Sequence, residues 1–181
     1  MHETLIFLSL LYSELAHPQL LLLMGYTARL ELVYEPVLLG SLYICLYIHS
    51  IPFRLEDIAL QVRQSNQHIR LEMEICLQVT DALIYLEDRD VVHRVVSSHA
   101  VQVTTLAGQV KLGMLEAAVR AGQHAMRPPD TKLYNWLGPE LLASQHCQAR
   151  VESDVYGLCC LIWELVHNQV SAGETRPVKA G

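Results

Sequence analysis

Positive charge is scarce in this sequence, and so are the cysteine patterns of exported proteins. The chain carries 13 lysines and arginines against 19 acidic residues, which gives a formal net charge of −6. Nucleic acids and anionic membranes are bound through basic faces, so we expect neither as a partner. The five cysteines form no C-x-x-C pair and no even set for disulfides. Free, buried thiols in a reducing compartment are therefore predicted, which favours a cytoplasmic location.

A basic leader and a membrane-spanning run are also missing. Glu3 stands where a signal peptide needs positive charge ahead of its apolar stretch. The apolar run 20–24 is far too short for a membrane span, and segment 30–48 is interrupted by two glutamates, a proline and a glycine. The sequence predicts neither secretion nor a transmembrane helix.

The residues that are present indicate one globular domain. The chain has 181 residues, of which 51% are hydrophobic and 18% charged, enough for one core and too few for two independent domains. Residues 171–181 combine glycine, proline and mixed charge without periodicity, and this predicts a disordered tail.

The spacing of apolar residues predicts a mixture of helices and short strands. Four segments have helical spacing: 4–16, 42–48, 68–88 and 155–166. Four short apolar runs pair as two hairpins: 20–26 with 30–35, and 101–103 with 110–112 around a turn at Ala107 and Gly108.

Two of these helices carry a further prediction about burial. The longest is expected to face the core with the apolar positions Ile69, Met73, Cys76, Leu77, Thr80, Leu83 and Ile84. The last is apolar on nearly every side from Val155 to Val166, so it is predicted to lie in the middle of a core, with Ser153 as its N-cap.

Short motifs stand between these elements in a definite order. They are HP at 17–18, LVYE at 32–35, GSL at 40–42, VVHR at 91–94, YNWLGPE at 134–140 and SDVYG at 153–157. Through these motifs, residues 5–168 resemble the protein kinase family in its tyrosine-kinase-like form. The resemblance implies an α+β, truncated protein-kinase-like fold, with a partial small lobe and a mainly helical, incomplete large lobe. It assigns a small-lobe remnant to 1–36, a large-lobe portion to 37–168 and a tail to 169–181.

The sequence departs from the family at the positions that carry the chemistry. In the family motif H-R-D-L-x-x-x-N, the aspartate is the catalytic base and the asparagine holds magnesium, and these positions fall on Val95 and Ala100. The magnesium-binding aspartate of D-F-G falls on Met114. Glu116 stands two residues farther on, where the backbone would aim its carboxylate differently. The resemblance therefore implies no catalytic residue and no metal site.

The groups that would bind ATP are also replaced. No glycine-rich loop is present, no lysine occurs before Lys111, and the helix glutamate that pairs with the family's lysine falls at Leu8. The resemblance places the gatekeeper at Tyr34 and the adenine-binding hinge at Glu35 to Val37, where the intervening proline removes one N–H donor. We expect no cofactor, and residual ATP binding at this hinge is disfavoured.

Other motif residues have structural interpretations. The resemblance makes His93 and Arg94 a scaffold for the catalytic loop and Asp154 an acceptor of hydrogen bonds from that loop's backbone. It pairs Glu140 with an arginine from a later helix, which is predicted to be missing. The histidines share no ligand spacing, so no zinc site is expected at His17, His93, His99 or His124. The segment with Pro128, Pro129 and Tyr134 is taken as a plain loop rather than a recognition segment.

Among inactive kinases, Ser97 and Ser98 together with LYNW at 133–136 resemble the testis-expressed inactive kinases of germ-cell intercellular bridges. That resemblance implies midbody or kinetochore proteins as partners and association with the cytoskeleton or midbody. The leading hypothesis is an inactive kinase-like domain that acts as a protein-binding scaffold. The alternatives are a divergent active kinase in a longer product and a splice or gene-model fragment without function.

Overall fold

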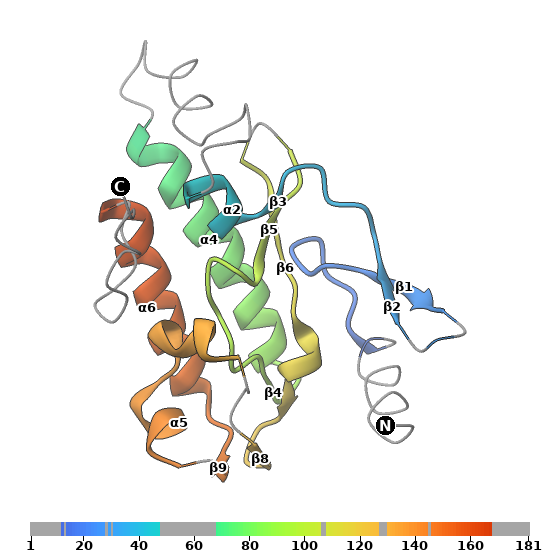
Figure 1. Cartoon of the computed structure of the whole chain (residues 1–181), viewed down its shortest axis with the longest axis vertical. Coiled ribbons are helices and arrows are strands. Elements are labelled where there is room, and N and C mark those ends of the chain that lie inside the picture. Colours follow the sequence, from blue (N-terminus) through green and yellow to red (C-terminus); the bar gives the residue numbers. More distant parts are fainter. Residues whose placement is uncertain are drawn as a thin grey trace, which may run out of the picture.

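The computed structural model describes residues 12, 14–27, 29, 31–47, 68–105, 108–126, 130–144 and 146–167. Short strands alternate with helices along the chain (Figure 1), so the predicted α+β class is confirmed. The strands are β1 Leu23–Tyr26, β2 Leu32–Tyr34, β3 Gly40–Ser41, β4 Val91–Val92, β5 Val101–Val103, β6 Val110–Leu112, β7 Val119–Arg120, β8 His124–Met126 and β9 His146–Gln148. The α-helices are α2 Leu42–Tyr47, α4 His68–Glu87, α5 Pro139–Ala143 and α6 Val151–His167, with 3-10 turns η1 Leu115–Ala117 and η2 Thr131–Trp136.

Both predicted hairpins are present, with shorter strands than expected for the first. β1 pairs antiparallel with β2, and β5 pairs antiparallel with β6 while β3 joins the other edge of β5. Gly108 has φ +79°, the left-handed conformation that glycine adopts without strain, which explains the turn before β6. The β1–β2 hairpin projects to one side of the remaining structure (Figure 1). Backbone hydrogen bonds of Leu112 with Gln19 and Leu21 attach the hairpin's N-terminal end to β6.

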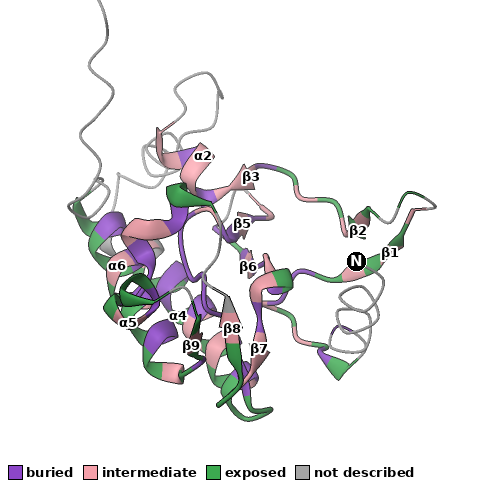
Figure 2. Cartoon of the chain, turned by 60° about the horizontal axis from the view of Figure 1, so that its bottom comes forward, coloured by how far each residue is buried: buried purple, intermediate pink, exposed green. Residues whose placement is uncertain are grey.

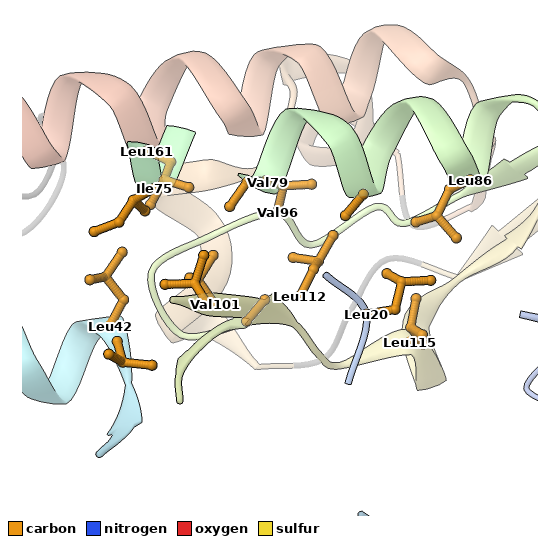
Figure 3. Packing of buried hydrophobic residues seen from close by; sticks show 14 of the residues in the cluster. Leu20, Leu42, Ile75, Val79, Leu86, Val96, Val101, Leu112, Leu115 and Leu161 are labelled. Atoms are coloured by element: carbon orange, nitrogen blue, oxygen red, sulfur yellow. The ribbon is translucent and has the colours of Figure 1, made fainter. Parts of the chain in front are cut away.

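The long helix lies where it was predicted, but the prediction of its buried face is confirmed only for Cys76, which is buried, and in part for Leu83, which packs against the core half-buried. Met73, Leu77 and Ile84 are 54%, 63% and 52% exposed. A different set of residues, also spaced by three and four positions, is buried in the structure: Ile75, Val79, Ala82 and Leu86, with Cys76 beside them. Apolar residues surround most of α4, so two sets of positions satisfy the helical period. Packing against both the β5–β6 sheet and α6 selects the second set (Figure 3).

The last helix is confirmed, but it does not lie in the middle of a core among the described residues. It begins at Val151, so Ser153 lies inside the first turn instead of capping it. One side packs against α4, whereas Val155, Ile162, Trp163 and Val166 are exposed on the other. The prediction of buried thiols holds for Cys45 and Cys76 but is wrong for Cys159, which is exposed.

The main core lies between α4, α6 and the β5–β6 sheet, where buried side chains concentrate (Figures 2 and 3). Leu20 from the segment before β1 and Leu42 from α2 close its sides. None of the helices in the described ranges is long and apolar enough to span a bilayer. Most of the predicted helix 4–16, the whole predicted tail 171–181 and the residues Ala107, Pro128 and Pro129 lie outside the described residues.

One pair of substitutions tests the corrected face of α4. Leu86 is fully buried in the core, so Leu86→Ala should lower the free energy of unfolding by about 2–5 kcal/mol through the lost contacts and the cavity. Leu77→Ala removes the same atoms from an exposed site on the same helix and should change it by less than about 0.5 kcal/mol. Urea denaturation of both variants measures the difference. Equal losses would mean that the helix is rotated relative to this structure.

Candidate functional site

The loop between β4 and β5 is held against α6 by one carboxylate. Asp154 accepts the backbone N–H of His93 through Oδ2 at 2.7 Å and that of Arg94 through Oδ1 at 2.6 Å. Arg94 has φ +73°, a strained conformation for a residue with a side chain, and both acceptor oxygens are buried with it. These bonds are the contact that the kinase resemblance implies for Asp154. They satisfy two buried backbone donors that would otherwise lack partners.

His93 is fixed as a neutral imidazole. Its Nε2 donates to the carbonyl oxygen of Gly113 at 2.7 Å, and its Nδ1 accepts the backbone N–H of Val95 at 3.3 Å. Complete burial lowers the pKa of His93 to about 4, although the bond to Gly113 opposes the shift. At neutral pH this side chain therefore links the loop to the end of β6 and carries no charge.

Burial acts in the opposite direction on Asp154. It raises the pKa of the carboxyl to about 7, against the effect of the two backbone N–H donors and of Arg94. The guanidinium of Arg94 is itself nearly buried and donates to the carbonyl oxygen of Ala117 at 3.2 Å. The charged groups of this region thus support the backbone around them.

The three positions that the resemblance assigns to the base and the metal ligands are apolar and packed. Val95 is 1% exposed and lies in a second hydrophobic cluster with Leu133, Leu137 and Leu141. Ala100 is 0% exposed in the main core. Met114 contacts both clusters and adopts a left-handed φ of +59°. None of these side chains presents a carboxylate or amide oxygen.

A chain of hydroxyl groups connects the gatekeeper position to the segment after β6. The hydroxyls of Tyr12 and Tyr34 are 2.9 Å apart, and Tyr34 donates to Oε2 of Glu116 at 3.3 Å. Since each phenol has one proton, Tyr12 donates to Tyr34 in this arrangement. Burial is the main cause that raises the pKa of Tyr34 to about 12 and that of Tyr12 still higher, so both hydroxyls are protonated at neutral pH. Nothing in the sequence links these residues, which are separated by 22 and 82 positions.

The first lysine of the chain is engaged by the predicted hinge. Lys111 Nζ lies 2.6 Å from Oε1 of Glu35, which also accepts the backbone N–H of Leu22 at 2.8 Å. Partial burial opposes ionisation, but these two partners lower the pKa of Glu35. The ion pair joins the β1–β2 hairpin to β6. Val37 follows two residues later and is half-buried.

Two glutamates have partners that the sequence did not indicate. Glu140 Oε1 accepts the hydroxyl of Ser153 at 2.5 Å, a different partner from the arginine that the kinase resemblance assigns to it. Glu164 is completely buried and accepts bonds from Ser98 Oγ at 2.8 Å and Trp136 Nε1 at 2.9 Å. The feature of the sequence that could have indicated this second network is Glu164, an acidic residue within the apolar stretch of α6.

The predicted histidine and tyrosine positions lie apart from one another. Nε2 of the half-buried His17 is 3.5 Å from Oδ2 of the exposed Asp81, and His99 stacks on Tyr43 with ring centroids 3.9 Å apart. Tyr134 lies in η2, and His124 in β8 is exposed. Within the ranges that the structure describes, no three histidine, cysteine or acidic side chains gather as a metal site.

Comparison with known proteins adds to this geometry. A family model described as "Protein tyrosine and serine/threonine kinase" matches residues 3–176. The chain is 32% identical over 169 residues to the inactive serine/threonine-protein kinase TEX14 of Mus musculus, and 30% identical over 169 residues to that of Bos taurus. Each alignment covers 87% of the chain but only 11% and 10% of those relatives. The chain is also 32% identical over 95 residues to the putative inactive tyrosine-protein kinase Wsck of Drosophila melanogaster, covering 52% of the chain and 11% of that relative.

The two perturbed groups around the loop predict opposite dependences on pH. Between their normal and folded pKa values, His93 binds fewer protons when folded, so its contribution to stability grows as pH rises. Asp154 binds more protons when folded, so its contribution shrinks as pH rises. Relative to the unmodified protein, the free energy of unfolding of Asp154→Asn should therefore rise with pH, and that of His93→Asn should fall.

Urea denaturation at several pH values between about 4.5 and 6.5 measures both differences, each of which is limited to about 1.4 kcal/mol per pH unit. Leu77→Ala, which removes an exposed side chain without a titratable group, is the control and should give a flat difference. Slopes of the same sign in the two loop variants would contradict the prediction.

Proposed function

Because the chain belongs to the protein tyrosine and serine/threonine kinase family, we propose that it is a catalytically inactive kinase-like module that acts by binding other proteins. The observation that carries this proposal is the burial of aliphatic side chains at the family's chemical positions. Val95 and Ala100 are 1% and 0% exposed and packed in hydrophobic clusters. The mouse, bovine and Drosophila relatives are all named as inactive kinases.

Phosphoryl transfer depends on positioned charge, which these positions do not supply. A base must accept the substrate's hydroxyl proton, and metal ions must be held by oxygen ligands beside the phosphates. Valine, alanine and methionine offer neither an acceptor for a proton nor an oxygen for a metal. Removing one comparable group already lowers the rate by about a hundredfold to a thousandfold, so losing all of them leaves little above background.

The residues present also do not fit bound ATP with magnesium. The amine of Lys111 forms an ion pair with Glu35, and the hydroxyl of Tyr34 is engaged by Glu116. Glu116, two residues after the D-F-G position, is exposed and hydrogen-bonded to Tyr34. A nucleotide would have to displace these internal bonds without gaining a lysine or a metal ligand. No step of the proposed function therefore uses a nucleotide.

A binding role follows from a framework that is retained without its chemistry. The bonds of Asp154, His93 and Glu164 hold the loop and the last helix in place, so the fold can present a defined surface. Proteins of the midbody or kinetochore remain the proposed partners, with a location on those structures, on the strength of the sequence resemblance. The chain spans about a tenth of the TEX14 relatives, so the activity and partners of a whole protein of that kind are part of this proposal.

A thermal melt with nucleotide tests the absence of a working pocket. Addition of millimolar ATP and magnesium should leave the melting temperature of the purified chain unchanged. A ligand present at a hundred times its dissociation constant would stabilise the fold by about 2.7 kcal/mol, a shift of several degrees. An active kinase measured in the same plate is the positive control. A reproducible increase for this chain would contradict the proposal that its site excludes nucleotide.

Restoring the base position tests whether activity was lost by more than one substitution. Val95→Asp places a carboxylate among Leu133, Leu137 and Leu141, and an unpaired buried charge should lower the free energy of unfolding by about 3–5 kcal/mol. Val95→Thr has a similar size without charge and should lose only about 1–3 kcal/mol. Urea denaturation and a phosphoryl-transfer assay follow both variants. Magnesium-dependent transfer by a stably folded Val95→Asp protein would contradict the proposal.

A further inference from the structure

The backbone that follows β6 passes through a conformation that its residues disfavour. Met114 has φ +59°, in the left-handed region that residues other than glycine rarely adopt. The short turn η1 comes directly after it. Ala117 and Ala118 close this turn by donating their N–H groups to the carbonyl oxygens of Met114 and Leu115, at 3.3 and 3.0 Å. A turn that starts from a strained residue persists only where the surrounding structure holds it in place.

Three contacts hold η1 from different sides. Leu115 is 1% exposed and packs in the main core (Figure 3). Arg94, in the loop after β4, donates to the carbonyl oxygen of Ala117. The third contact is the hydrogen bond from the hydroxyl of Tyr34 to the carboxylate of Glu116. Of these three contacts, it is the one that comes from the β1–β2 hairpin.

The contact from the hairpin is one end of a chain of hydroxyl groups. Tyr12, ahead of β1, is 8% exposed, and its hydroxyl lies 2.9 Å from that of Tyr34. The two rings meet edge to face with centroids 5.9 Å apart. A backbone hydrogen bond from Leu115 to the Tyr12 hydroxyl brings the chain back to η1. The chain therefore joins the segment before β1, the end of β2 and η1.

The place of this chain in the fold indicates what it does. The turn η1 follows the D-F-G position, which in an active kinase is tied to a metal ion and to the phosphates of the nucleotide. Met114 supplies no oxygen for a metal, so on the proposed function no such ligand holds the turn. We propose that Tyr12, Tyr34 and Glu116 form a latch that takes the ligand's place and keeps η1 closed against the β1–β2 hairpin. The surface that the module presents to a partner is then fixed without nucleotide.

A separate set of contacts attaches the hairpin itself. The ion pair between Lys111 and Glu35 joins β6 to the predicted hinge, and the backbone N–H of Glu35 donates to the carbonyl oxygen of Leu22 at 2.9 Å. Neither contact uses the hydroxyl of Tyr34 or the carboxylate of Glu116. Loss of the latch should therefore free η1 while the hairpin stays attached to β6.

Amide hydrogen exchange of the purified chain, followed by NMR without nucleotide, tests the latch. Tyr34→Phe removes the hydroxyl and keeps the ring, so the amides of Ala117 and Ala118 should exchange about tenfold faster. The amide of Gly122 is the internal reference. It lies in an exposed turn on the far side of β7, where it donates to the carbonyl oxygen of Ala149 at 2.9 Å, and its rate should not change.

Two further variants separate the latch from general effects of substitution. Glu116→Ala, at an exposed residue, removes the other end of the same bond and should also accelerate exchange in η1. Because both substitutions break one shared bond, the double variant should exchange more slowly than the product of the two single effects predicts. Tyr26→Phe makes the same chemical change at an exposed tyrosine of β1, so it should leave η1 unaffected. If Tyr34→Phe does not fold, Glu116→Ala takes its place.

Three results would overturn the latch. They are unchanged rates at Ala117 and Ala118 in Tyr34→Phe, an equal acceleration at Gly122, and single effects that multiply fully in the double variant. The first would mean that packing and Arg94 suffice to hold η1, and the second that the hydroxyl supports the whole fold. Because the exchange is measured without nucleotide, its outcome is distinct from that of the thermal melt with ATP, which tests the proposed function.

Discussion

The two hydrogen bonds that Asp154 accepts from the backbone of His93 and Arg94 are the constraint on which the rest of this structure depends. The loop that follows β4 turns through a left-handed residue in a buried place, so its N–H groups have no access to water. A carboxylate supplied by α6 satisfies both of them. Because the loop is held in place, the ring of His93 can hydrogen-bond to the carbonyl oxygen of Gly113, and this bond fixes the position of the end of β6.

This framework is independent of the chemistry that its family performs. The bonds of Asp154 and His93 involve backbone atoms, so they persist whatever side chains stand at Val95 and Ala100. Those two side chains add packing to the hydrophobic clusters beside the loop. An aspartate or asparagine there would need polar partners inside the same clusters, because a buried polar group without a partner is destabilising. In the proposed function, the loss of chemistry and the gain of packing are two aspects of one change.

Much of the fold could be predicted from the sequence, because apolar spacing and short motifs specify element type and order. The hairpins and the helices α2, α4 and α6 were predicted with small errors at their ends. The buried face of α4 was predicted only in part, since Leu77 and Leu86 are equally apolar and only packing against two neighbours distinguishes them. The links from Tyr34 to Glu116 and from Lys111 to Glu35 join residues 82 and 76 positions apart. Contacts over such separations leave no periodic signal in one sequence.

The two sides of α6 show why hydropathy alone wrongly predicted that this helix lies in the middle of a core. Its inner side carries Asp154 and Glu164, because the loop donors and the indole of Trp136 need acceptors in a place without water. Its outer side carries Val155, Ile162 and Val166, which gain nothing from water and can be stabilised by another apolar surface. The inner side of the helix therefore maintains the framework around the loop.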